Sequence, residues 1–292
     1  MGFDDLEGWR TDPQYFGALV GRFANRIDGG RFVLDGEEVR VGINRPPHHL
    51  HGGVSGFDKA IWSAEPFEEE DTAGVLLRHH SPDGDEGYPG ALDVSVTYTL
   101  DATGALTLTY VATCDAPTIV NLTNHVYFDL GGTGSVLDHE LTVHAPHFLE
   151  VDAATIPTGQ ILSVDRTPFD FRSPRRVGER IADDHPQLGV ADGYDHCFVV
   201  DGEPGTLRPC AVVEAAGRRL EVETTQPGVQ VYSGNGIRER SARGGRRLGT
   251  HGGLCLETEG FPDAPNHPHF PSARLDPGEE YREVTVYRLG PA

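Results

Sequence analysis

Apolar and polar residues alternate at every second position over much of this chain, and this pattern constrains the fold more than any other feature. Segments 92–100 and 105–113 both alternate in this way, and the short glycine-containing connection between them is typical of a β-hairpin. Similar hairpins are predicted at 31–41 and 208–224, and a closing strand at 281–289. The chain is therefore expected to be built from antiparallel strands.

Helical periodicity is almost absent from the sequence. Only segment 177–185 could form one or two helical turns. The 292 residues include 37 glycines and 21 prolines, which interrupt helices and suit many short strands joined by turns. We find no linker-like tract and no internal repeat, so we predict one all-β domain spanning residues 1–292, either a sandwich or a barrel.

The charge balance excludes several classes of partner. With 24 basic and 45 acidic residues, the formal net charge is −21. Such a field repels phosphate backbones and anionic lipid, so no nucleic-acid or membrane partner is expected, whereas a neutral small molecule would not be repelled. No apolar run is long enough to span a membrane, and the first residues lack the pattern of a secretion signal.

The cysteine pattern agrees with an intracellular location. The four cysteines are widely separated and form no C-x-x-C pair, which favours reduced thiols over a disulfide framework or a zinc site. We predict a cytoplasmic protein that is a monomer or a homodimer.

Several polar, turn-rich stretches interrupt the alternating pattern, and functional side chains tend to gather on such strand ends and loops. These stretches are "GRFANRIDGG" (21–30), "HHLHGG" (48–53), "SPDGDEGYPG" (81–90), "NLTNHVYFDLGG" (121–132), "DGYDHCF" (192–198), "TTQPGVQVYSGN" (224–235) and "LCLETEGFPDAPNHPHFP" (254–271).

Two ionisable residues in these stretches are candidates for proton transfer. His125 begins an aromatic-rich strand, although a lone histidine there is more often a hydrogen-bonded structural residue. Glu257 lies inside the apolar run "LCLETE", where a carboxylate must be paired, hydrogen-bonded or raised in pKa. A raised pKa would suit a general base near neutral pH, while the alternative is a strand-end glutamate that faces solvent with Glu259 beside it.

Other residues offer hydrogen bonds to a polar ligand. Asn25 and Arg26 combine an amide with a guanidinium, a pair that can bind several oxygens of a polyol or simply form a surface turn. His51 precedes two glycines that would let backbone approach a ligand closely, or it belongs to a tight turn. Asp195 and Gln230 offer acceptor and amide groups suited to hydroxyls.

Known metal, nucleotide and nucleophile motifs are absent from the sequence. There is no H-E-x-x-H or spaced His/Cys set, no calcium loop, no G-x-S-x-G elbow and no G-x-G-x-x-G in a βαβ unit. We therefore predict no metal and no cofactor. The remaining groups are of the kind that move protons on a polar, neutral substrate.

Seven segments together resemble the aldose 1-epimerase (galactose mutarotase) family. They are "YFGALVGRFANRI", "LHGGVSGFDKAIW", "SPDGDEGYPG", "TNHVYFDLGG", "GYDHCF", "TTQPGVQVYSGN" and "LCLETEGFPDAPNHPHFPSARLDPGEEY", in the family's order from near residue 15 to about residue 281. The resemblance implies a large antiparallel β-sandwich, the galactose mutarotase-like supersandwich. The family has further strands before the "GFDDLEGW"-like segment. The resemblance therefore implies that the family's first strands are missing here, which would expose a sheet edge or leave part of the core uncovered.

The resemblance also implies an isomerase that needs no cofactor and interconverts the α and β anomers of free hexoses such as galactose and glucose. Glu257 would be the general base at the C1 hydroxyl, and His125 the general acid at the ring oxygen. On this view His125 starts protonated and is oriented by a polar neighbour such as Asn124, with Glu257 ionised. The residues expected to bind the sugar are Asn25, Arg26, His51, Tyr127, Asp195 and Gln230.

Two alternatives remain open at the level of sequence. One is a non-catalytic carbohydrate-binding module on the same scaffold, which the presence of both His125 and Glu257 disfavours. The other is a hexose-6-phosphate 1-epimerase, which would need a local cationic site built from Arg45, Arg78 or Arg238.

Overall fold

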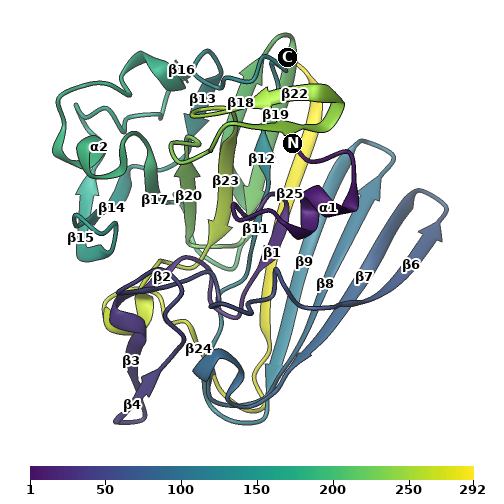
Figure 1. The fold of residues 1–292 in the computed structure, drawn as a ribbon, viewed down its shortest axis with the longest axis vertical. Helices are drawn as coiled ribbons and strands as arrows, with labels where there is room; N and C mark the ends of the chain where they lie inside the picture. The colour runs from purple at the N-terminus through teal and green to yellow at the C-terminus, as the bar shows by residue number, and fades with distance from the viewer.

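The computed structural model describes all residues from Met1 to Ala292, and antiparallel β-sheets dominate it (Figure 1). The larger of two main sheets has nine strands. In sheet order they are β16 (Arg175–Arg176), β13 (Glu140–Val143), β18 (Arg208–Ala215), β19 (Arg218–Thr224), β25 (Tyr281–Pro291), β9 (Ala105–Cys114), β8 (Leu92–Asp101), β7 (Thr72–Ser81) and β6 (Ser63–Glu69).

The second main sheet has six strands and carries the residues discussed below. Its order is β12 (Tyr127–Phe128), β23 (Leu254–Glu259), β20 (Gly228–Tyr232), β17 (Asp195–Val199), β14 (His147–Val151) and β15 (Pro157–Ser163). Two-stranded pairs complete the fold: β1 (Ala18–Val20) with β11 (Thr123–His125), β2 (Arg26–Ile27) with β5 (His49–Leu50), β3 (Arg31–Leu34) with β4 (Glu37–Arg40), β10 (Thr118–Ile119) with β24 (Arg274–Leu275), and β21 (Arg240–Ala242) with β22 (Arg246–Leu248).

The predicted hairpins are confirmed. Strands β8 and β9 pair from Leu92 opposite Cys114 to Leu100 opposite Leu106. The turn between β3 and β4 lies at Asp35-Gly36, where both residues have positive φ, the geometry that matches the twist of a two-residue hairpin. The all-β, antiparallel prediction is therefore correct, and the fold is the expected sandwich.

Only two short α-helices are present, α1 (Leu6–Arg10) and α2 (Pro186–Ala191). Segment 177–185, where one or two helical turns were expected to be possible, holds a single 3₁₀ turn at Val177–Glu179 and no α-helix. The true helix starts immediately after it because Pro186 occupies the first turn and the His185 side chain accepts a hydrogen bond from the Gln187 N–H. Neither helix is long and apolar enough to cross a membrane.

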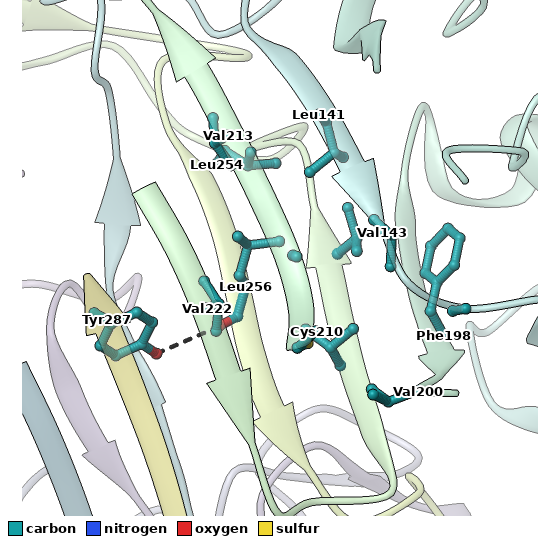
Figure 2. Packing of buried hydrophobic residues seen from close by; sticks show 14 of the residues in the cluster. Leu141, Val143, Phe198, Val200, Cys210, Val213, Val222, Leu254, Leu256 and Tyr287 are labelled. Atoms are coloured by element: carbon teal, nitrogen blue, oxygen red, sulfur yellow. Dashed lines mark hydrogen bonds between the residues drawn. The ribbon is translucent and has the colours of Figure 1, made fainter. Parts of the chain in front are cut away.

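The main core lies between the two large sheets. Figure 2 shows side chains from β17 and β23 of the six-stranded sheet packed together with those from β13, β18, β19 and β25 of the nine-stranded sheet. Leu254 and Leu256 of β23 are both buried in this cluster, and the Tyr287 hydroxyl of β25 donates to the Leu256 carbonyl oxygen at 3.4 Å. The core thus fixes β23 from one side.

Replacing Leu256 by alanine tests this support. We expect Leu256→Ala to lower the free energy of unfolding by about 2–5 kcal/mol, because it leaves a cavity in a side-chain position that is 1% exposed. Denaturant unfolding measures the loss. A change below about 0.5 kcal/mol would contradict the packing described here.

Candidate active site

The pleat of β23 separates core residues from cleft residues. Leu254 and Leu256 point into the main core, so Cys255, Glu257 and Glu259 point to the opposite face of the sheet. All six residues of the strand are buried. Three polar or ionisable side chains are therefore aligned on one face of a strand that has no solvent-exposed side.

The neighbouring strands of this sheet continue the same face. Gln230 of β20 lies directly opposite Glu257, and the next residue on this face of β20, Tyr232, lies opposite both Cys255 and Asp195 of β17. The alternating residues Val229 and Val231 pack in the core. The register of three adjacent strands thus brings the predicted residues Glu257, Gln230 and Asp195 together.

A cleft of about 500 Å³ opens over this face. It is lined by all eight residues predicted for the site. The full lining is Pro13, Gln14, Tyr15, Asn25, Arg26, Arg45, Leu50, His51, His125, Tyr127, Asp195, Gln230, Tyr232, Gly236, Arg238 and Glu257. The volume is within the range of small-molecule sites.

The centre of the cleft is the pair His125 and Glu257. Nε2 of His125 lies 3.6 Å from Oε2 of Glu257, and the side chains are only 6% and 3% exposed. Oε2 of Glu257 is buried and has no hydrogen-bond partner. Behind the ring, Nδ1 of His125 contacts Sγ of Cys255 at 3.6 Å, and the Tyr127 ring stacks on it with centroids 4.9 Å apart.

Burial dominates the proton affinities of this pair. It raises the pKa of Glu257 well above its ordinary value, with further increases from Glu259 and Asp195. Burial also lowers the pKa of His125 to about 4, although the charge of Asp195 acts in the opposite direction. Both shifts disfavour the charged forms, so the empty cleft favours a protonated Glu257 beside a neutral His125. The expectation of an imidazolium at the start is not supported for the empty cleft.

Two hydrogen bonds join His51 and Asn25. The Asn25 backbone N–H donates to Nδ1 of His51 at 3.1 Å, and the His51 backbone N–H donates to the Asn25 carbonyl at 3.0 Å. Because Nδ1 accepts, the neutral ring carries its proton on Nε2. The glycine after His51 serves backbone packing rather than ligand approach, since a Cβ on Gly52 would meet the Gly21 carbonyl oxygen at 1.7 Å.

Hydrogen bonds within the protein hold the remaining polar residues. Oδ1 of Asn25 accepts from NH1 of Arg26 at 3.1 Å, and NH2 of Arg26 lies 3.6 Å from Oδ2 of Asp195. Nε2 of Gln230 donates to Oδ1 of Asp195 at 2.7 Å, which leaves Oε1 of Gln230 buried without a partner. The cleft therefore contains two buried acceptors without donors, one on Gln230 and one on Glu257.

A metal ion fits this arrangement poorly. His51, His125 and Glu257 each offer a ligand atom, and these atoms lie within 4.8 Å of one another. However, the Asn25 N–H on Nδ1 of His51 keeps the proton on Nε2, and a metal ligand needs a free lone pair there. The cluster instead combines a hydrogen-bond donor on His51 with a buried, unpaired acceptor on Glu257.

Comparison with known proteins agrees with this geometry. The model of the family "Aldose 1-epimerase" matches residues 1–288. The chain belongs to the aldose 1-epimerase family. It is 48% identical to "Galactose mutarotase" of Bos taurus, over 100% of this chain and 84% of that protein, and 39% identical to "Aldose 1-epimerase" of Escherichia coli (strain K12), over 99% and 84%. A crystal structure of galactose 1-epimerase from Lactobacillus acidophilus NCFM matches with a TM-score of 0.91, at 29% identity, over 100% of this chain and 85% of that one.

Membership of the aldose 1-epimerase family confirms the predicted isomerase class. One detail of the predicted site is nevertheless wrong. Asn124 does not orient His125, because it faces the other side of β11 and donates to the Tyr98 hydroxyl at 2.8 Å. The Tyr127 hydroxyl donates to the Gln14 carbonyl at 3.0 Å, and its ring lines the cleft and stacks on His125. Its contact with a sugar stays a prediction.

Sequence reasoning did not single out Tyr15 or Tyr232. The Tyr15 ring lies against His51 with centroids 4.7 Å apart and stacks over His125 at 5.9 Å. Tyr232 follows Gln230 by two positions, so the alternation of β20 could have identified it. Tyr15 precedes the first strand, and no local pattern indicates that it lines the cleft.

Proposed function

We propose that the chain is a mutarotase that interconverts the α and β anomers of free hexoses such as galactose and glucose, with Glu257 and His125 as the proton-transfer pair. The observation that carries the proposal is the unpaired, buried Oε2 of Glu257, 3.6 Å from Nε2 of His125 inside a cleft of about 500 Å³. The similarity to galactose mutarotase of Bos taurus supports the choice of sugar.

The proposed reaction needs one proton transfer at each of two oxygens of the sugar, the anomeric hydroxyl and the ring oxygen. Glu257 takes the proton from the anomeric hydroxyl while His125 gives one to the ring oxygen, and the bond between C1 and the ring oxygen breaks. Rotation about C1–C2 exposes the other face of the open aldehyde. Closure reverses both transfers, so the pair ends with the proton it started with. Fixed geometry and opposite protonation states supply the acceleration.

Both arrangements of the single proton take part in this cycle. The pyranose reacts with ionised Glu257 and protonated His125, and the open-chain aldehyde reacts with protonated Glu257 and neutral His125. Burial favours the second arrangement in the empty cleft. A sugar hydroxyl that donates to Oε2 of Glu257 stabilises its carboxylate, which moves the proton to His125 when the pyranose binds.

Substitution of either partner tests the proposed roles. We expect Glu257→Gln and His125→Asn each to lower kcat by about 100- to 10,000-fold, because each removes one proton transfer. Polarimetry on freshly dissolved α-galactose or α-glucose, corrected for the buffer rate, measures the effect. The matched control is Glu283→Gln, which alters a carboxylate on β25 bonded to Thr225 outside the cleft. Wild-type protein that equilibrates α-galactose and α-glucose no faster than buffer would rule out the proposal.

The pH dependence follows from the shifted pKa values. The active pair holds exactly one proton, so kcat/KM falls on the acid side when His125 also binds a proton, near pH 4. It falls on the alkaline side when Glu257 loses its proton, and the raised pKa of Glu257 moves this limb upward. We expect a plateau through neutral pH in polarimetric kcat/KM. An acid limb centred near the ordinary histidine value of about 6.5 would contradict this assignment.

A phosphorylated hexose is the second candidate substrate. Arg45 and Arg238 line the cleft, and neither is in an ion pair, whereas Arg78 lies outside the cleft and pairs with Glu65 at 2.8 Å. We expect a higher kcat/KM for free galactose and glucose than for their 6-phosphates, since the central cleft offers neutral and paired groups. A preference for the phosphates that disappears in Arg45→Gln or Arg238→Gln would favour the second candidate.

We further propose that the protein acts in the cytoplasm. All four cysteines are free thiols, and Cys197, Cys210 and Cys255 are buried. Burial raises the pKa of the Cys210 thiol to about 12 and that of Cys255 well above its ordinary value, so both remain protonated and unreactive. These features suit a reducing compartment.

A further inference from the structure

Glu259 is a buried carboxyl group that the proposed proton transfers do not use. It lies two residues after Glu257 on the same face of β23 and is fully buried, but it does not line the cleft. Its Oε1 accepts a hydrogen bond from Nδ2 of Asn25 at 2.8 Å, and its Oε2 has no partner. Burying a carboxyl group with only one hydrogen bond costs free energy, so the presence of Glu259 at this position needs an explanation.

That hydrogen bond leads directly to the cleft through Asn25. The Asn25 side chain is held at Nδ2 by Glu259 and at Oδ1 by Arg26, while its backbone N–H donates to Nδ1 of His51. Asn25 has a φ of +64° and His51 a φ of +51°, a backbone region that asparagine tolerates better than most residues. Side-chain anchoring therefore helps to keep the Asn25 N–H pointed at the ring of His51.

We propose that Glu259 is a positioning residue that, through Asn25, fixes His51 as the ring tautomer with its proton on Nε2. The Nε2–H then faces the cleft as a permanent donor for an oxygen of the sugar. Without the anchor, Asn25 can turn its N–H away from Nδ1, and the ring can adopt the other tautomer, which presents a lone pair to the same oxygen. The effect on catalysis rests on the proposed function, whereas the effect on the tautomer does not.

The hydrogen bond, rather than a negative charge, is the feature of Glu259 that matters. Burial raises the pKa of Glu259 to about 8, so at neutral pH it is mostly uncharged. A second ionised carboxylate beside Glu257 would also oppose the ionisation that Glu257 needs as a base. The side-chain amide of glutamine can accept the same bond from Asn25 without a charge. Glutamine should therefore replace Glu259, and alanine should not.

The test combines Glu259→Gln and Glu259→Ala with histidine ring spectra. In ¹⁵N-labelled protein without sugar, long-range ¹H–¹⁵N correlations report which ring nitrogen of His51 carries the proton, and a His51→Gln variant assigns its signals. We expect the Nε2–H tautomer in the wild type and in Glu259→Gln, with kcat/KM for α-galactose changed less than about threefold. In Glu259→Ala we expect a mixture of tautomers and a fall in kcat/KM of about tenfold or more.

Glu283→Ala is the control for the loss of a half-buried carboxyl group elsewhere in the fold. It removes the bond that Glu283 of β25 accepts from Thr225, outside the cleft, and should change neither the His51 tautomer nor kcat/KM. The proposal is overturned if wild-type His51 carries its proton on Nδ1, or if Glu259→Ala keeps both the tautomer and kcat/KM. It is also overturned if Glu259→Gln loses as much kcat/KM as Glu259→Ala while the tautomer stays unchanged.

A second variant keeps the test decisive if Glu259→Ala does not fold. Asn25→Ala removes the other partner of the same hydrogen bond but leaves the carboxyl group in place, and it should give the same mixture of His51 tautomers. An unchanged Nε2–H tautomer in Asn25→Ala would overturn the proposal. Because the spectra need no sugar, they remain informative even if the wild type does not accelerate mutarotation of galactose.

Discussion

The burial of one carboxyl group against one imidazole is the constraint on which the rest of this structure depends. Neither Glu257 nor His125 is exposed enough for water to stabilise its charge, so the pair favours a single shared proton and no net charge. In the proposed reaction, a bound sugar supplies hydrogen bonds that this pair lacks. The buried Oε2 of Glu257 has no hydrogen-bond partner within the protein.

Keeping two desolvated groups 3.6 Å apart requires a rigid frame, and strand register provides it. His125 and Glu257 are far apart in the chain, yet Tyr127 of β12 pairs with Cys255 of β23, and His125 lies two residues before Tyr127. A slip of one residue in this pairing would turn Glu257 into the core and Leu256 into the cleft. The leucines of β23, locked between the two large sheets, oppose such a slip (Figure 2).

The sequence predicts the sheet well because alternation reports directly on which face of a strand is buried. The same logic identified Glu257, a carboxylate inside an apolar strand. It failed where long-range contacts decide the outcome. Asn124 is adjacent to His125 in sequence but faces the other side of its strand. Asn25 contacts the distant His51 because β2 pairs with β5. Segment 177–185 forms only one 3₁₀ turn for a local reason, because Pro186 sets the start of the α-helix after it.

Local charge, not net charge, governs what this cleft can accept. The chain carries a formal charge of −21, yet the cleft lining contains the guanidinium groups of Arg26, Arg45 and Arg238 and only two carboxyl groups, Asp195 and Glu257. Asp195 lies beside Arg26, and the raised pKa of Glu257 removes most of its charge when the cleft is empty. The inner cleft is thus nearly neutral and suits uncharged hydroxyls, while Arg45 and Arg238 add positive charge to its lining. These two arginines would attract an anionic sugar locally, whereas the acidic field of the whole protein repels an anion and leaves a neutral sugar unaffected.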